Sequence, residues 1–300
     1  MIILLVLALS LSTPLPTSLL TNTSALASTF QQKCVQILPT NFEHHTSLAS
    51  LVCGEKITDT ELKENLSKTS LIHIFVISGS HLILLDELLS IFKIPVIVRF
   101  LFLGSYSLVS GWQAPAARAF LGLGLREVFR RRHLHLPADF SVLAAGFTTL
   151  ILFPGWWNSL SLQMSWCAAL ALSTSSALRI RNTLARTVFS QVAIFFFMSA
   201  PLWGLGSLHP LSILYNLFLA PVVSYILLPL SFLAAVLSPF LVLFEKIMTV
   251  FSETLVVLAE PIEIHKRPLP SVGLLWTWIL GWHCVMHFLR LHLWQGKDAP

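Results

Sequence analysis

This chain consists largely of apolar stretches about as long as a helix needs to cross a bilayer, roughly 20 residues. Hydrophobic residues make up 55% of the sequence and charged residues 11%, and the mean hydropathy is +0.77. So few charges leave too little polar surface to cover a soluble globule. We therefore predict an all-α fold, a polytopic transmembrane helical bundle with about seven to nine membrane segments. The stretches lie at 2–20, 69–92, 94–112, 136–153, 156–178, 188–206, 211–236, 238–259 and 271–293.

The N-terminal part divides at about residue 28. Residues 1–28 fit two alternatives, a signal peptide cleaved after Ala25-Leu26-Ala27 or a retained membrane anchor, because no basic residue precedes the apolar run. Residues 29–68 form a short non-membrane segment. Its cysteines, Cys34 and Cys53, would form a disulfide in an oxidising compartment and otherwise remain thiols. The membrane domain follows at 69–293, and 294–300 form a tail.

Basic loops indicate the orientation. Arg130, Arg131 and Arg132 precede one pair of predicted spans, and Arg179, Arg181 and Arg186 follow it. The positive-inside rule places both loops in the cytoplasm, with the pair turning at Phe153-Pro154-Gly155. The rule gives no consistent answer for the last span, because both Lys266-Arg267 and Arg290 flank it.

Polar residues interrupt the apolar run LIHIFVISGSHLILL at residues 71–85. Polar groups are costly in hydrocarbon and therefore usually face a protein interior or a wet cavity. In one regular helix, His73, Ser80 and Glu87 would share a stripe, with His81 about 80° to one side. Alternatively, Gly79 interrupts the helix and exposes backbone groups. In both cases the polar side chains either line a path or bond neighbouring helices together.

Residues 208–236 contain Pro210, Pro221 and Pro229 together with Asn216. Each interior proline removes one helical hydrogen bond, so we predict a broken helix rather than a straight one. Such breaks occur where freed carbonyls line a cavity, or where a kink improves packing.

Residues 115–133 predict an amphipathic surface helix, with leucines on one face and charged residues on the other. Arg118 breaks this pattern because it projects from the apolar face. It would either snorkel to lipid headgroups or act as a fixed cation, near an anionic substrate or tied to a carboxylate such as Asp86 or Glu87.

The segment HIFVISGSHLILL at 73–85 resembles the signature H-[LI]-x-x-[IV]-S-G-x-H-[VIL] of the ComEC-type competence channel family. Similar blocks follow the family's order over about 48–240, namely LASLVCG (48–54), GWQAPAARAF (111–120), WNSLSLQMSWCAALAL (157–172) and the serine, asparagine and proline block at 211–229. Ser80 and Trp166 depart from the family's usual residues. The resemblance assigns a DNA path to His73, Ser78, Gly79, Ser80, His81, Arg118, Gln163, Ser165, Asn216, Pro221 and Pro229.

The resemblance implies a multi-pass channel of the bacterial inner membrane that passes single-stranded DNA into the cytoplasm during natural transformation. Partners would be single-stranded DNA, membrane lipids, a DNA receptor, a separate nuclease and a cytoplasmic ATP-driven motor, and the chain would act alone or as a homo-oligomer. The sequence shows no P-loop and no H-x-H-x-D-H metal signature, so we expect no enzyme activity, no catalytic residue, no cofactor and no metal. The alternatives are a small-solute permease, a structural membrane subunit or, with less support, an intramembrane serine hydrolase.

Overall fold

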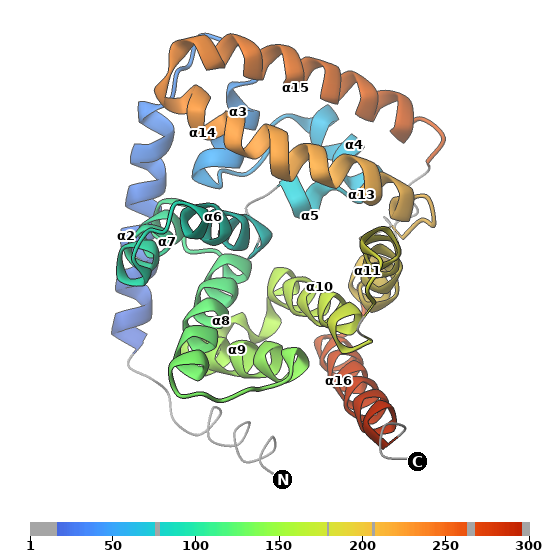
Figure 1. The fold of residues 1–300 in the computed structure, drawn as a ribbon. Helices are drawn as coiled ribbons and strands as arrows, with labels where there is room; N and C mark the ends of the chain where they lie inside the picture. The colour runs from blue at the N-terminus through green and yellow to red at the C-terminus, as the bar shows by residue number, and fades with distance from the viewer. Residues whose placement is uncertain (1–16, 76–78, 179, 206–207, 263–267, 296–300) are drawn as a thin grey trace. The chain divides into compact units, whose positions relative to one another are not determined.

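The computed structural model describes residues 17–75, 79–178, 180–205, 208–262 and 268–295, and every regular element in these ranges is helical (Figure 1). This confirms the predicted all-α fold. The chain divides into two compact units, which are described separately. Unit 1 contains Leu121–Leu205 and Lys266–Pro300, and unit 2 contains Pro16–Phe120 and Gly206–His265.

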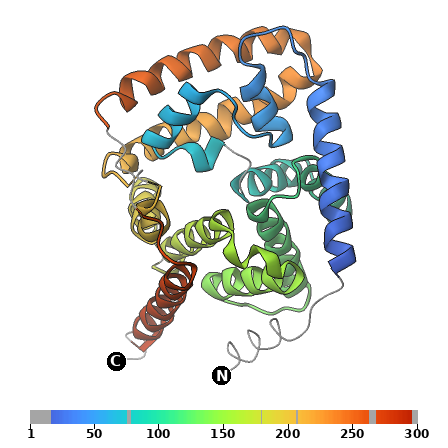
Figure 2. The ribbon, with the colours of Figure 1, turned by 180° about the vertical axis from the view of Figure 1, so that it is seen from behind.

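Unit 2 is organised around α15, which packs on α14 and α4 (Figure 1). The buried side of α15 carries Phe244, Met248, Phe251 and Leu255, spaced three or four residues apart as on one face of a helix. On the other side of the unit, α2 packs against α7 (Figure 2). The elements are α2 (Thr17–Ile37), α3 (His45–Cys53), α4 (Thr60–Lys68), α5 (Ile72–Phe75), α6 (Gly79–Ile91), α7 (Val96–Val109), the start of α8 (Ala114–Arg131), α13 (Ser212–Pro221), the π-helix η2 (Val222–Leu227), α14 (Leu228–Val236) and α15 (Ser238–Ala259).

Unit 1 is held together by tryptophan side chains. α10 packs against α9, α11 and α16. The indole of Trp157, in the turn after α9, stacks on that of Trp276 near the start of α16, with ring centroids 4.7 Å apart. The elements are the end of α8, α9 (Ala138–Leu152), the 3-10 helix η1 (Pro154–Asn158), α10 (Leu160–Ala177), α11 (Thr183–Phe197), α12 (Ser199–Trp203) and α16 (Val272–Gln295).

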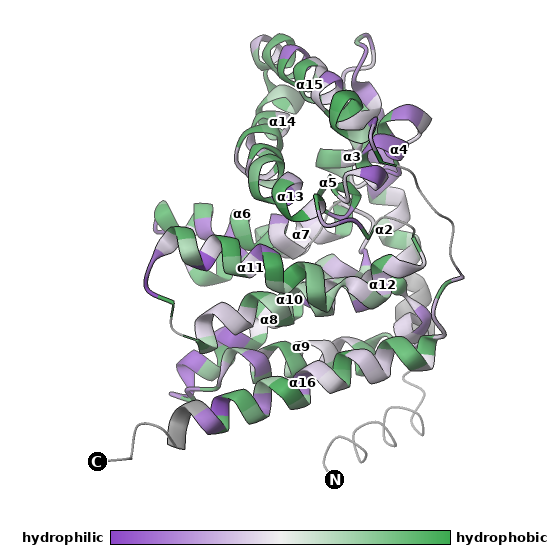
Figure 3. Ribbon diagram, turned by 90° about the vertical axis from the view of Figure 1, so that its right-hand side faces the viewer, coloured by the Kyte–Doolittle hydropathy of each residue, from purple (hydrophilic) through white to green (hydrophobic). Residues whose placement is uncertain are grey.

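Among the described residues, two helical stretches have both the length and the composition of a membrane span, Ser212–Val236 and Val272–His292. Val96–Val109, Ala138–Leu152 and Thr183–Phe197 are apolar but shorter. Figure 3 shows hydrophobic residues along α13 and α14 and hydrophilic residues on α4. The polytopic part of the predicted bundle therefore remains a prediction.

The predicted span at 238–259 stays a prediction. It forms a single helix, α15, which carries Glu245, Lys246 and Glu253 and is not among the candidate spans. α15 packs on the polar helix α4 and meets the polar segment before α3, where His44 Nε2 lies 2.9 Å from Thr249 Oγ1. Hydropathy alone does not reveal these polar neighbours.

Helix breaks are predicted at two places. In the run at 71–89 the described residues form α5, to Phe75, and α6, from Gly79, and residues 76–78 between them lie outside the described residues. The stretch 212–236 stays helical but changes to π-helix over Val222–Leu227, as expected for a broken helix. At the N-terminus, α2 continues through residues 28 and 29, so no helix end marks the predicted boundary between anchor and non-membrane segment.

Candidate functional site

The start of α6 touches the start of α8 within unit 2. A Cβ added at Gly79 would lie 2.9 Å from the Ala119 Cβ, 3.4 Å from the Pro115 carbonyl oxygen and 3.6 Å from Arg118 Nη2. A glycine is required because any side chain would push the two helices apart. The contact places the Arg118 guanidinium beside the N-terminus of α6.

Arg118 itself is only 7% exposed. The protein covers the side chain, so Arg118 does not snorkel to a headgroup layer. The alternative, a cation fixed inside the protein, agrees with the structure. The described part of α6 begins at Gly79, and the dipole of a helix favours an anion toward its N-terminal side.

The two histidines of the signature lie on different helices. His81 on α6 is 0% exposed and hydrogen bonds to the backbone of Ile74, whereas His73 on α5 is half-buried and hydrogen bonds to the backbone of Ser70. The predicted stripe of His73, Ser80 and Glu87 requires one unbroken helix through residues 76–78, which lie outside the described residues, so it stays a prediction. These bonds give both histidines a part in holding the segment together.

Ser80 is exposed on α6, next to the buried His81. The two side chains thus occupy opposite environments, and this arrangement gives no support to a serine–histidine pair. Ser78 lies outside the described residues. In the part of the chain that the structure describes, no group of three or more His, Cys, Asp or Glu side chains is placed to hold a metal ion.

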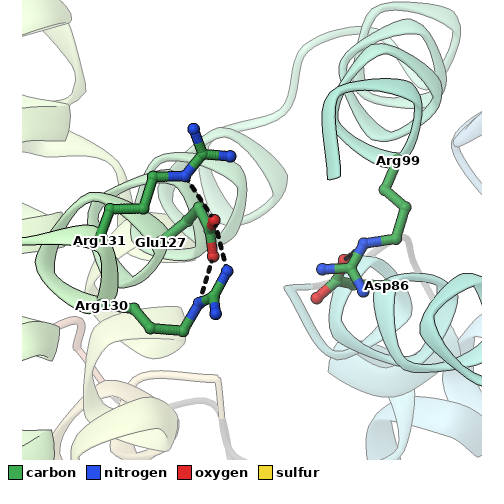
Figure 4. Close-up of polar contacts among 5 residues, drawn as sticks. All are labelled: Asp86, Arg99, Glu127, Arg130 and Arg131. Atoms are coloured by element: carbon green, nitrogen blue, oxygen red, sulfur yellow. Dashed lines mark hydrogen bonds and ion pairs between the residues drawn. The ribbon is translucent and has the colours of Figure 1, made fainter. Parts of the chain in front are cut away.

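Asp86 pairs with Arg99 of α7, with 3.2 Å between Oδ1 and Nε (Figure 4). The sequence predicts Arg118 as one candidate partner for this carboxylate. Arg99 lies 13 residues after Asp86 in sequence, across the turn between α6 and α7, and both side chains are largely buried. The pair ties α6 to α7.

The broken helix contributes Asn216, Pro221 and Pro229. Asn216 on α13 is 7% exposed, and its Oδ1 accepts no hydrogen bond from the described residues. Pro221 ends α13 and Pro229 lies in the first turn of α14. Between them the Leu228 N–H donates to the Val223 carbonyl five residues earlier, which is the π-helical bonding pattern. η2 packs against both α5 and α6, so the break lies against the signature segment.

Gln163 and Ser165 lie on α10, in unit 1. Gln163 is 1% exposed and its Nε2 donates to the Trp157 carbonyl at 3.3 Å, which also accepts from Trp276 Nε1 at 3.0 Å. Ser165 is half-buried. The predicted site is therefore divided: unit 2 gathers His73, Gly79, Ser80, His81, Arg118, Asn216, Pro221 and Pro229, and unit 1 holds the other two.

Comparison with known proteins places these motifs in one family. The model of a family described as "Competence protein" matches residues 51–296. The chain belongs to the Competence protein family. The match runs from α3 into α16 and includes every residue of the candidate site. Membership supports a role in competence and DNA uptake.

A relative of this Competence protein is the "Uncharacterized protein MG316" of Mycoplasma genitalium, which is 28% identical over 183 residues. The alignment covers 57% of this chain and 48% of the relative, so the chain spans about half the length of the curated relative that it matches. No solved structure matches the chain.

Trp166 departs from the usual residue of this Competence block, and the structure shows what the indole does. Its Nε1 donates to His283 Nε2 at 2.9 Å, which a phenylalanine cannot do. The ring lies so close to Gly146 of α9 that an added Cβ there would overlap it. Trp166 thus joins α9, α10 and α16.

Cys34 and Cys53 form a disulfide with their Cα atoms 5.8 Å apart, which links α2 to the end of α3. Gln31, one turn before Cys34, donates to the backbone carbonyls of Cys53 and Gly54. Gln31 lies outside the motifs recognised in the sequence. An isolated glutamine outside the motifs gives no signal of such a contact.

The end of α8 carries a cluster of charged side chains (Figure 4). Glu127 accepts two hydrogen bonds from Arg130, each 2.7 Å long, and one of 2.8 Å from Arg131. These bonds lower the pKa of the Glu127 carboxyl from 4.5 to about 2. The acidic group compensates part of the positive charge of this basic loop.

Proposed function

We propose that this chain is an inner-membrane channel that passes single-stranded DNA into the cytoplasm during natural transformation. The observation that carries the proposal is the buried Arg118 guanidinium beside the start of α6, in the unit where the π-helical break packs against α5 and α6. Family membership supports the broader role in competence.

The chemistry of a DNA strand fits this arrangement. Its phosphates need cations or hydrogen-bond donors along a hydrated path, and a helix N-terminus supplies donors. Conduction requires binding that is weak enough to release the strand. One arginine with the dipole of α6 would attract a phosphate without retaining it.

The broken helix supplies the second element of the path. At membrane depth, irregular backbone is tolerated where it is buried in protein or lines a water-filled cavity. Asn216 adds a buried amide one turn before Pro221. In our proposal, these groups face the strand from the side of α13 and η2.

The membrane arrangement is part of the proposal. The stretches Ser212–Val236 and Val272–His292 would cross the inner membrane fully. Helices of 14 or 15 residues, such as α7 and α9, are only about 21–23 Å long, against a core of about 30 Å. They would cross with help from adjoining loops or where the bilayer is locally thinner.

The chain would conduct DNA without degrading it. A receptor would deliver the DNA, a separate nuclease would remove one strand, and a cytoplasmic ATP-driven motor would pull the other. Membrane lipids would surround the helices, and a second copy of the chain would complete the channel if it is a homo-oligomer.

The test is complementation of a deletion strain with Arg118→Ala, using Arg126→Ala as the control because Arg126 is exposed on the same helix. The readouts are labelled DNA that reaches the cytoplasm, protected from added nuclease, and the amount of protein in the membrane. A hydrogen bond to a charged group is worth about 1.5–3 kcal/mol, so Arg118→Ala should lower uptake at least about tenfold at equal abundance. Arg126→Ala should change it less than about twofold.

Normal uptake in the deletion strain, or in Arg118→Ala at equal abundance, would overturn the proposal. Purified protein in proteoliposomes separates the alternatives. Entry of a small solute without any DNA would favour a permease, and passage of neither would favour a structural subunit.

A further inference from the structure

The carbonyl oxygen of Gly54 accepts hydrogen bonds from two glutamine side chains. Gln31 Nε2 on α2 and Gln113 Nε2 before α8 each lie 2.8 Å from it, and Gln31 Nε2 also donates to the Cys53 carbonyl at 3.1 Å. Gly54 is buried and ends α3 with a φ of +68°, a conformation that favours glycine. We call these two glutamines and the Gly54 carbonyl the clasp.

Gln113 extends from a strained turn between α7 and α8. Gly111 has a φ of +81° and Trp112 a φ of +49°, which is uncommon for a bulky residue. The Trp112 N–H donates to the Ser107 carbonyl at 2.8 Å and the Gly111 N–H to the Leu108 carbonyl at 3.0 Å, as in a Schellman motif. Residues in such conformations persist only when their surroundings hold them.

The clasp supplies such surroundings on both sides of the turn. The Gln31 side chain packs on Gly111 so closely that a Cβ there would lie 2.9 Å from its Oε1. The disulfide from Cys34 to Cys53 fixes α2 to α3 one turn further along. Two contacts therefore hold the turn in place: Gln113 bonds to the Gly54 carbonyl, and the Gln31 side chain packs on Gly111.

The turn leads directly into α8 and Arg118. The Ala117 N–H donates to the Gln113 carbonyl at 2.9 Å, which begins the helix, and Arg118 is the next residue. A shift of Gln113 would therefore move the first turn of α8, whose Ala119 touches Gly79.

We propose that Gln31 and Gln113 are positioning residues that hold the start of α8, and with it Arg118, against the start of α6. The link to DNA transport rests on the proposed function. The clasp is a separate claim about which contacts order this turn.

The test uses the full chain with Gln113→Glu and Gln31→Glu, which keep the side-chain size but remove the N–H donors. Gln32→Glu is the matched control, because it adds the same charge to an exposed position of α2. In purified protein in nanodiscs, amide hydrogen exchange in peptides covering 107–120 should become about five- to tenfold faster in both clasp variants, as expected for the loss of one hydrogen bond. Peptides covering 160–177 and the control should not change.

The second readout is a double-mutant cycle for DNA uptake at equal membrane abundance. If the clasp acts through Arg118, Gln113→Glu should lower uptake several-fold alone but add nothing to Arg118→Ala. If Gln113 only supported folding, the fold-changes in DNA uptake caused by Gln113→Glu and by Arg118→Ala would multiply in the double variant. Multiplying effects, or unchanged exchange in both clasp variants, would overturn the proposal.

Failure of the proposed function gives a different result. If the deletion strain takes up DNA normally, the channel proposal is wrong, and the exchange experiment still decides whether the clasp orders the turn. Because Gln31 and Gln113 lie on different segments, either variant is sufficient if the other does not reach the membrane.

Discussion

Nη1 of Arg290 lies 2.6 Å from Oδ1 and 2.8 Å from Oδ2 of Asp139, which joins the C-terminal end of α16 to the first turn of α9. Arg290 Nη2 also lies 3.0 Å from His287 Nδ1. The pair balances the charge of Arg290 and places it at the end of α9 that follows the basic loop 130–132. If that loop faces the cytoplasm as predicted, Arg290 faces it too, and Lys266-Arg267, outside the described residues, is the exception.

Loss of this pair should destabilise the protein. Arg290→Gln leaves the buried Asp139 carboxylate without its bidentate partner, which we expect to cost about 1–3 kcal/mol. Thermal unfolding in detergent would measure the loss, with Arg186→Gln as an exposed control in unit 1. Adding Asp139→Asn should recover part of it, and equal stability of Arg290→Gln and Arg186→Gln would contradict the expectation.

Gly146 should tolerate no side chain. In Gly146→Ala the new Cβ would overlap the Trp166 ring, and overpacking of this kind costs about 1–3 kcal/mol. Gly281→Ala is the control, because nothing lies within 4 Å of a Cβ there and alanine favours a helix by up to about 1 kcal/mol. Denaturation midpoints should therefore move in opposite directions, and a fall in both would show that the contact with Trp166 is not decisive.

Gly79→Ala should separate α6 from α8. The added Cβ would lie 2.9 Å from the Ala119 Cβ, so we expect lower DNA uptake at unchanged membrane abundance. Ala119→Gly in the same chain should restore most of the uptake, although glycine in a helix costs about 1 kcal/mol. Ser90→Ala, at an exposed position of α6 outside the candidate site, serves as the control, and failure of Ala119→Gly to rescue would argue against this contact.

Glu127 should remain ionised far into the acidic range. Its folded-state pKa is lowered from 4.5 to about 2, so its contribution to stability is complete above about pH 4.5 and is lost as the pH falls toward 2. Carbon-13 NMR of the labelled carboxyl would follow the titration. Arg130→Gln combined with Arg131→Gln should raise the midpoint, whereas Arg132→Gln should not, and equal midpoints in all three proteins would contradict the assignment.

Local signals in the sequence predicted the elements that depend on near neighbours. The amphipathic pattern at 115–133 corresponds to α8, and the turn at 153–155 leads into η1. Prolines predicted the break in 212–236 because each lacks an amide hydrogen. The type of break, a π-helix, was not predictable, since the bonding pattern there depends on packing against α5, α6 and α15.

Contacts between residues far apart in the chain could not be predicted from the sequence. Gln31 lies 22 residues before Cys53, and Gln113 lies 59 residues after Gly54. Contacts over such separations leave no periodic pattern in the sequence. The choice of Arg99 as the partner of Asp86 depends on how α6 turns into α7. Burial of Arg118 follows from the small residues at 79 and 119, and their contact is set by the fold of unit 2.

The π-helical segment also absorbs one residue of the chain. Hydrogen bonding to the fifth residue back accommodates one residue more than an ordinary helix of the same rise. Each residue of an α-helix turns the chain by about 100°. Deleting one residue from Val222–Leu227 would therefore restore ordinary helical bonding with Asn216 and α14 facing nearly as before, whereas a deletion from the α-helical residues 217–220 would turn Asn216 by about that angle relative to α14.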